Sequence, residues 1–126
     1  MWPGFAALAD RFDGPVVVYT GPGERFETCH PTREGLPLDQ LAACLERAAA
    51  LVSNDSGLAH FARAVGVRTV VVFGSTSPAR TGPAGCVPVE GPDLPCRPCY
   101  RKRCPYPGVP CLDIPVAQVE AALRQA

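Results

Sequence analysis

The chain has 126 residues, 47% of them hydrophobic, so it is long enough for one domain with one core and too short for two ordinary domains. Twelve basic and twelve acidic residues cancel, which excludes a global field that would attract nucleic acid or an anionic membrane. No apolar run reaches the length of about 18 residues needed to span a bilayer, and the first residues do not resemble a signal peptide. We therefore expect a single cytoplasmic domain over residues 1–126.

Helix-like and strand-like segments alternate along the chain. We expect helices over 3–12, 24–29, 38–49, 56–65 and about 115–125, strands over 16–19, 50–53, 68–73 and 86–89, and irregular structure over 30–37 and 74–85. Strands that alternate with helices form a parallel sheet whose crossover helices cover both faces. The predicted fold is therefore a Rossmann-like, three-layer α/β/α domain of the α/β class, with one parallel sheet.

The stretch SNDSGLAHFA, residues 53–62, leaves a predicted strand and begins a helix. Its first residues are capping types, and the free N–H groups of the first helical turn would form an anion site. His60 lies on the same helix face as Ser56, four residues earlier, where an imidazole can donate to a phosphate oxygen. A capped helix without any ligand is the commoner meaning of this motif alone. The residues expected at the anion are Asp55, Ser56, Gly57, Leu58, Ala59 and His60.

Two further loops follow predicted strands, GPGE at 21–24 and FGSTSPARTGP at 73–83. Ligands of open parallel sheets bind at the carboxyl ends of the strands, so we expect all three loops to meet at one sheet edge. Gly21 suits a tight turn, whereas Glu24 can accept hydrogen bonds from ribose hydroxyls. GPGE does not start a dinucleotide fingerprint, because Phe26 stands where the third glycine would fall.

Together these strings resemble the C-terminal, donor-binding half of glycosyltransferase family nine, the lipopolysaccharide heptosyltransferases, which have a GT-B fold. The resemblance rests on WP near the start, VVVYTGPGE, LVSNDSGLAHFARAVGVRTVVVFGSTSP, the following TGP, the spaced cysteines and the closing helix. It implies that the Asp-Ser-Gly-x-x-His element holds the diphosphate of an ADP-sugar, ADP-heptose above all. It also implies that Glu24 contacts the ribose, with Gly21 in the same donor-binding loop, and that the backbone around Leu36 to Leu38 forms a shelf for adenine.

The resemblance further implies an inverting transfer, in which an acceptor hydroxyl attacks the anomeric carbon while the nucleoside diphosphate leaves. His60 and the helix N-terminus would stabilise the leaving group, and the transfer would need no cofactor. Two features depart from the family. Met1 stands where a donor-binding lysine commonly precedes the Trp-Pro pair, and nothing matches the acceptor-binding half with its catalytic carboxylate. We expect a donor domain that is inactive without that half and that contacts the cytosolic membrane face only peripherally.

Four cysteines are spaced C-x2-C-x4-C-x6-C between residues 96 and 111, with basic residues between them that favour thiolates. This is not a standard zinc-ribbon spacing, so structural zinc, an iron–sulfur cluster, and free or adventitiously oxidised thiols all remain open. The alternative function is a small metal-stapled module that contacts nucleic acid or anionic headgroups. Neutral net charge favours the transferase domain, with no specific nucleic acid partner. The residues concerned are Cys96, Cys99, Cys104 and Cys111, with Arg97, Arg101, Lys102 and Arg103.

Overall fold

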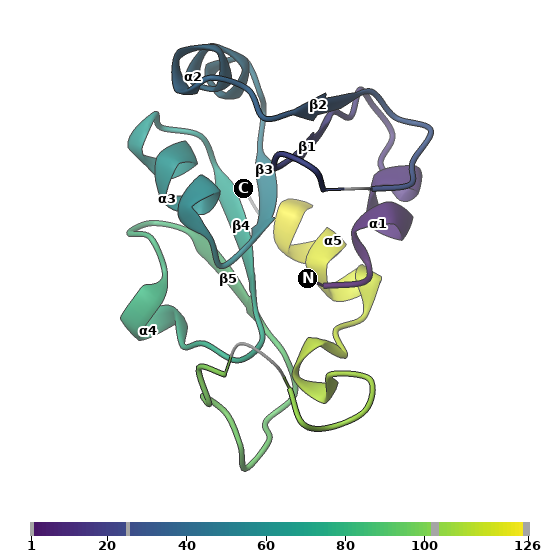
Figure 1. Ribbon diagram of the computed structural model, residues 1–126, viewed down its shortest axis with the longest axis vertical. Coiled ribbons are helices and arrows are strands. Elements are labelled where there is room, and N and C mark those ends of the chain that lie inside the picture. The colour runs from purple at the N-terminus through teal and green to yellow at the C-terminus, as the bar shows by residue number, and fades with distance from the viewer. Residues whose placement is uncertain (1, 25, 102–103, 125–126) are drawn as a thin grey trace.

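The computed structural model describes residues 2–24, 26–101 and 104–124 (Figure 1). The elements in chain order are α1 (Phe5–Arg11), β1 (Val18–Thr20), β2 (Thr32–Glu34), α2 (Leu38–Glu46), β3 (Leu51–Asn54), α3 (Gly57–Ala64), β4 (Thr69–Phe73), α4 (Pro78–Thr81), β5 (Val87–Glu90), a 3-10 turn (Pro110–Leu112) and α5 (Val116–Arg124). Strands β3, β4 and β5 form a parallel sheet in that order, and β1 and β2 pair in parallel in a second sheet. Among the described residues, no helix has both the length and the apolar character needed to cross a membrane.

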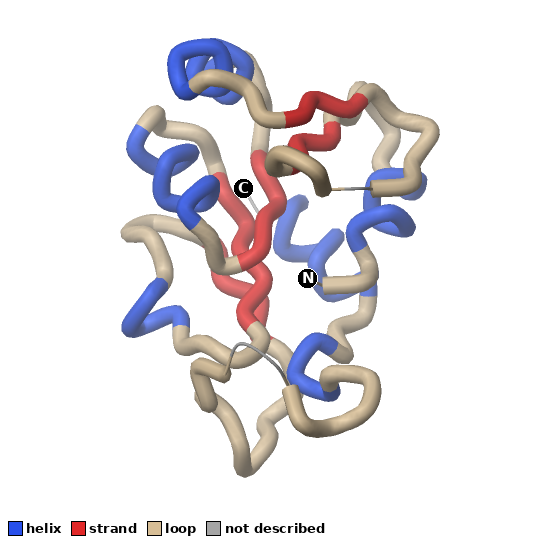
Figure 2. The backbone as a smooth tube through the Cα atoms, in the orientation of Figure 1, coloured by secondary structure: helices blue, strands red, loops and turns tan. Residues whose placement is uncertain are grey.

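Strand β4 lies at the centre of the core, and all five of its residues are buried. Because side chains alternate along a strand, Val70 and Val72 pack in one apolar cluster with residues of α1 and α5. Val71 and Phe73 pack in another cluster with Ala59 of α3. Figure 2 shows α3 on one side of these strands and α1 and α5 on the other. The structure thus confirms an α/β fold with parallel strands and helices on both faces.

The first and last helices are attached to the sheet by buried aromatic and polar contacts. Trp2 is 1% exposed, its indole Nε1 donates to the carbonyl oxygen of Ile114 at 3.1 Å, and its ring meets that of Phe5 edge-on at 5.1 Å. At the other end of α5, the Arg68 guanidinium donates to the carbonyl oxygens of Ala122 and Leu123. A cation there compensates the negative end of the helix dipole.

The predicted single sheet is wrong, because the strands form two sheets. Strand β1 is three residues long, and its backbone groups form hydrogen bonds with a segment that the sequence predicts to be irregular. Val18 N donates to Pro31 O at 2.8 Å and Gly35 N donates to Thr20 O at 3.0 Å, so residues 32–34 become β2. The described part of 24–29 is not helical, and so short a segment would need a buried apolar face to be helical. Residues 74–85 also contain the short helix α4.

The remaining elements lie within a few residues of their predicted bounds. Gly66 ends the turn after α3 with a φ of +88°, a left-handed conformation that suits glycine, as the sequence predicted. The closing helix α5 is confirmed from Val116 to Arg124, and residue 125 lies outside the described residues.

Replacing Trp2 by Phe is expected to lower the free energy of unfolding by about 2 kcal/mol, because the smaller ring leaves a void and the Ile114 carbonyl loses its donor. The measurement is urea denaturation followed by far-ultraviolet circular dichroism. Phe12, which is 45% exposed, provides the control, and Phe12→Ala should cost less than about 1 kcal/mol. Equal losses in the two variants would contradict the buried role of Trp2.

Candidate functional site

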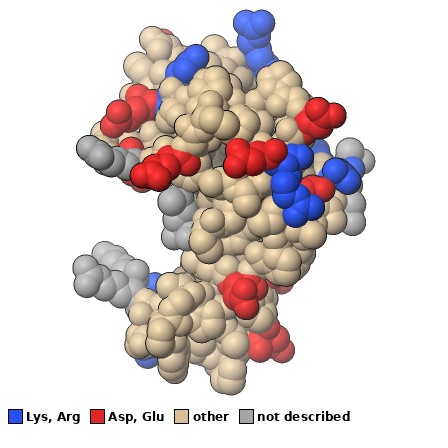
Figure 3. Space-filling view, turned by 90° about the vertical axis from the view of Figure 1, so that its right-hand side faces the viewer, with Lys and Arg blue, Asp and Glu red and all other residues tan. Residues whose placement is uncertain are grey.

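A hollow of about 720 Å³ lies where β3 and β4 end. One wall contains Asn54 and Asp55 after β3 and residues 74–76 after β4, and the opposite wall consists of described residues of the cysteine segment, which spans residues 96–111. Figure 3 shows the molecule narrowed between its upper body and a lower lobe, with basic and acidic side chains interspersed on the face in view. A hollow of this size at the carboxyl ends of parallel strands is the usual position for a ligand in an α/β fold.

Thr81 joins the loop after β4 to the motif after β3. Its Oγ1 donates to Asp55 Oδ2 at 2.6 Å, and its carbonyl oxygen lies 2.9 Å from His60 Nε2. A carbonyl can only accept, so Nε2 carries the proton in this contact. His60 is exposed, and a contact from it to phosphate would come from Nδ1 of the imidazolium form, or from Nε2 after release from Thr81. Thr81 belongs to the TGP string of the family resemblance, which assigns it no role.

The start of α3 has capping residues whose side chains do not cap it. Ser56 occupies the N-cap position with extended φ and ψ, yet its hydroxyl lies 3.2 Å from Ser53 Oγ and makes no bond to the helix. Asn54 Oδ1 instead accepts from the amide of Trp2 at 3.2 Å. In the described part of the chain, no group accepts a hydrogen bond from the amides of Gly57 or Leu58. Two N–H groups at the positive end of the helix are therefore open to an anion.

One detail of the predicted anion site is wrong. The amide of Ala59 donates to the Ser56 carbonyl at 3.2 Å, because the first turn is tightened in the manner of a 3-10 helix. Only the amides of Gly57 and Leu58 remain from the three that were expected. Ser56 and Gly57 are exposed at the surface, whereas Leu58 is half-buried.

The predicted ribose and adenine contacts gather around the β1–β2 sheet and do not line the hollow. Glu24 folds back so that its Oε2 accepts from Gly21 N at 3.0 Å, and Gly23 N donates to Glu34 Oε1 at 2.6 Å. Leu36 is half-buried, and Leu38 is 68% exposed at the first position of α2. The expected meeting of three loops is thus reduced to two, because β1 belongs to the other sheet.

All four cysteines of the cysteine segment line the hollow and all four thiols are free. Among the described residues, no three of their sulfurs lie within 4.8 Å of one another, so this arrangement is not a ready-made metal cage. Burial raises the pKa of the Cys111 thiol, and the neighbouring Cys104 and Cys99 act in the same direction while Arg97 opposes them. These effects disfavour the thiolate form of Cys111 in the chain without a bound metal.

Arg97 fixes the cysteine segment to the ends of β4 and β5. Its Nε donates to Gly74 O at 2.6 Å, its Nη1 to Gly91 O at 3.1 Å, and its Nη2 lies 3.5 Å from Glu90 Oε1. At Gly91, an added Cβ would lie 1.8 Å from the Cys111 carbonyl oxygen, so only glycine permits this approach.

One of the four basic residues expected to contact nucleic acid or headgroups in the alternative function, Arg97, is not available for such a contact. The Arg97 side chain is 10% exposed and occupied by carbonyl oxygens, so it is not available for a phosphate or headgroup. Arg101 is exposed and lines the hollow, whereas Lys102 and Arg103 lie outside the described residues. The position of Arg97 between cysteines predicts that it favours thiolates, but carries no local signal for its contacts with the strand ends.

The parallel strands, the helices on both faces and the hollow at the strand ends define a Rossmann-like α/β protein. Residues 34–109 match the family described as glycosyltransferase family 9 (heptosyltransferase), and the chain belongs to this family. Over 72 residues, 56% of this chain, it is 44% identical to lipopolysaccharide heptosyltransferase 1 of Pseudomonas aeruginosa. The match covers only 20% of the length of that relative. No solved structure matches the chain.

Replacing Arg97 by Ala is expected to free the cysteine segment while the sheet stays folded, because several carbonyl oxygens lose one shared donor. The amides of Cys99 and Tyr100, which donate to Ser75 O, should exchange with deuterium about tenfold faster. The measurement is hydrogen exchange followed by mass spectrometry. Arg101→Ala, at an exposed site, is the matched control and should leave exchange unchanged. Protection that persists in the Arg97 variant would show that other contacts hold the segment.

Proposed function

We propose that this chain binds the nucleoside-diphosphate sugar donor of a heptosyl transfer, ADP-heptose by the family resemblance. The observation that carries the proposal is the motif of Asp55, Ser56, Gly57 and His60. It falls within the family match, directly after β3, and leaves two helix amides open. Asp55 also lines a hollow large enough for a nucleotide sugar.

In this proposal the diphosphate rests on the N-terminus of α3. The open amides and a helix dipole of about half a positive charge stabilise the negative charge that develops as the nucleoside diphosphate leaves. His60 adds a donor from the same face of the helix, one turn further on. Thr81 positions it, because its carbonyl oxygen accepts from the ring and its hydroxyl fixes Asp55.

The general base for the acceptor hydroxyl lies elsewhere in the proposed mechanism. Of the described residues that line the hollow, Asp55 alone is a carboxylate, and Thr81 already donates to it. We propose that an acceptor-binding half supplies the base and that the acceptor belongs to lipopolysaccharide, as the name of the matched relative indicates for that protein. Transfer then takes place between the two halves, and this chain alone binds the donor without transferring it.

The proposal predicts that ADP raises the melting temperature of the chain. At ten times its dissociation constant, a ligand of the folded state adds about 1.4 kcal/mol, or about 5 °C for a chain of this size. The measurement is differential scanning fluorimetry with millimolar ADP, with adenosine as the ligand that lacks the diphosphate.

Matched variants localise the effect. Asp55→Ala and His60→Ala should lose most of the ADP shift, because one orders the loop before the helix and the other contacts the phosphate. Asp13→Ala changes an exposed carboxylate away from the hollow and should keep the full shift. A wild-type chain that gives no shift, or the same shift with adenosine, would refute the diphosphate site.

A further inference from the structure

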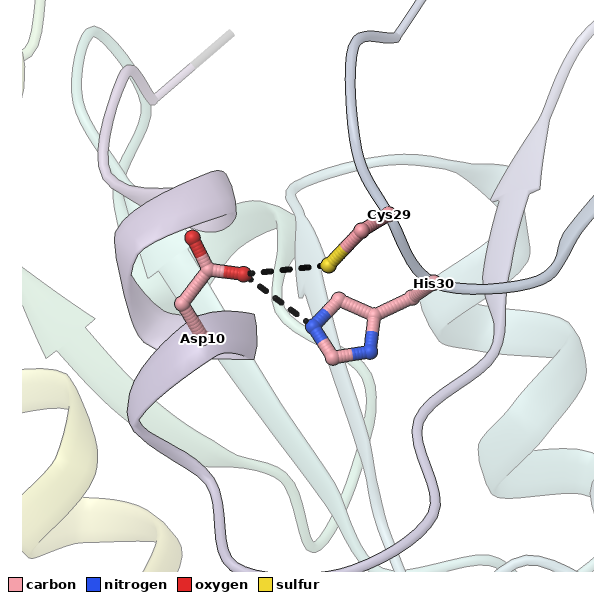
Figure 4. A group of neighbouring side chains, drawn as sticks. All are labelled: Asp10, Cys29 and His30. Atoms are coloured by element: carbon pink, nitrogen blue, oxygen red, sulfur yellow. Dashed lines mark hydrogen bonds and ion pairs between the residues drawn. The ribbon is translucent and has the colours of Figure 1, made fainter.

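A group of metal-ligating side chains lies apart from the hollow, between α1 and the segment that precedes β2 (Figure 4). The Asp10 Oδ1 atom lies 3.2 Å from His30 Nε2 and 3.9 Å from Cys29 Sγ. All three ligand atoms lie within 4.8 Å of one another, and no other such group of three occurs in the part of the chain that the structure describes. Cys29 and His30 are neighbours in sequence, whereas Asp10 comes from a helix that precedes β1.

The spacing of these atoms fits a tetrahedral metal site. With zinc–ligand bonds of about 2.0–2.3 Å, two ligand atoms of a tetrahedral ion lie about 3.3–3.6 Å apart. The distances from Asp10 Oδ1 to His30 Nε2 (3.2 Å) and to Cys29 Sγ (3.9 Å) differ from these ligand–ligand distances by a few tenths of an ångström. One nitrogen, one sulfur and one oxygen donor suit zinc and exclude magnesium and calcium, which prefer oxygen ligands.

We propose that Asp10, Cys29 and His30 bind Zn²⁺, with water as the fourth ligand. An ion pair between Asp10 and His30 accounts for one contact, but it leaves unexplained why the Cys29 sulfur points at the same carboxylate oxygen. Half-buried His30 and exposed Asp10 and Cys29 leave the fourth corner accessible to solvent. On binding, the Cys29 thiol releases its proton to water and the thiolate takes its place on the metal.

The ion would connect α1 to the β1–β2 sheet. Directly after His30, the Pro31 carbonyl accepts from Val18 N of β1, and Glu34 of β2 holds the amide of Gly23. Leu8 of α1 is buried in the core under β4 and α5. Zn²⁺ at this site therefore joins the two sheets through α1, independently of the proposed donor site.

The test uses Cys44 as an internal control, since it is also an exposed free thiol and belongs to no ligand group of the described residues. The reduced chain is alkylated with iodoacetamide with and without Zn²⁺, and mass spectrometry gives the rate at each cysteine. We expect Zn²⁺ to slow the labelling of Cys29 at least about tenfold, because the metal-bound thiolate is neither free nor accessible. Labelling of Cys44 should not change, and EDTA should restore Cys29.

Variants distinguish this site from the cysteine segment. Every variant keeps that segment, so any zinc bound there contributes equally to the variants and to the wild type. Cys29→Ser and His30→Gln should each bind one Zn²⁺ fewer per chain than the wild type by elemental analysis, and Cys44→Ser should bind the same number. Circular dichroism in EDTA confirms that the variants are folded. Equal Zn²⁺ content in Cys29→Ser and Cys44→Ser, or unchanged Cys29 labelling, would overturn the proposal. Neither result bears on the ADP shift, so the two proposals fail separately.

Discussion

The complete burial of β4 is the constraint on which the rest of the structure depends. Its backbone pairs with β3 on one side and β5 on the other, and its side chains alternate between two apolar clusters. A strand buried on both faces needs helices on both, which is why α3 covers one face and α1 and α5 cover the other. Neighbouring parallel strands also end side by side, so β3 and β4 deliver their polar loops to the same hollow.

The Arg97 side chain holds the far wall of the hollow against the ends of β4 and β5. Gly74 and Gly91 follow the ends of β4 and β5, and their carbonyl oxygens both accept from the Arg97 guanidinium. A planar cation with five N–H donors suits this position, because it bonds several carbonyls at once. The glycines matter for a second reason, since a Cβ at either would collide with residues 111–112. These contacts hold the cysteine segment against the ends of β4 and β5.

Periodic apolar patterns explain how much of the fold could be predicted. Apart from the short helix α4, the strands and helices from residue 38 onward carry buried faces that the sequence displays. Strand β2, in contrast, is polar and exposed at all three residues and exists because β1 pairs with it. The same limit applies to the site. Asp55 and His60 follow from a local motif, but their partner Thr81 lies 26 and 21 residues away, and Asp10 lies 19 residues from Cys29. Contacts between residues so far apart in the sequence depend on how the chain folds, and a local sequence pattern does not predict them.

The difference between a capped helix and an anion site rests on where the capping side chains point. In a simple cap, Ser56 would accept from an amide of the first turn, worth about 1 kcal/mol to the helix. Its hydroxyl lies against Ser53 instead, and Asp55 is held by Thr81, so that stabilisation is forgone. Packing compensates, because Ala59 and Ala62 are fully buried against the sheet and against α2. An anion that accepts from Gly57 and Leu58 would restore the missing bonds, which gives the folded chain a physical reason to bind one.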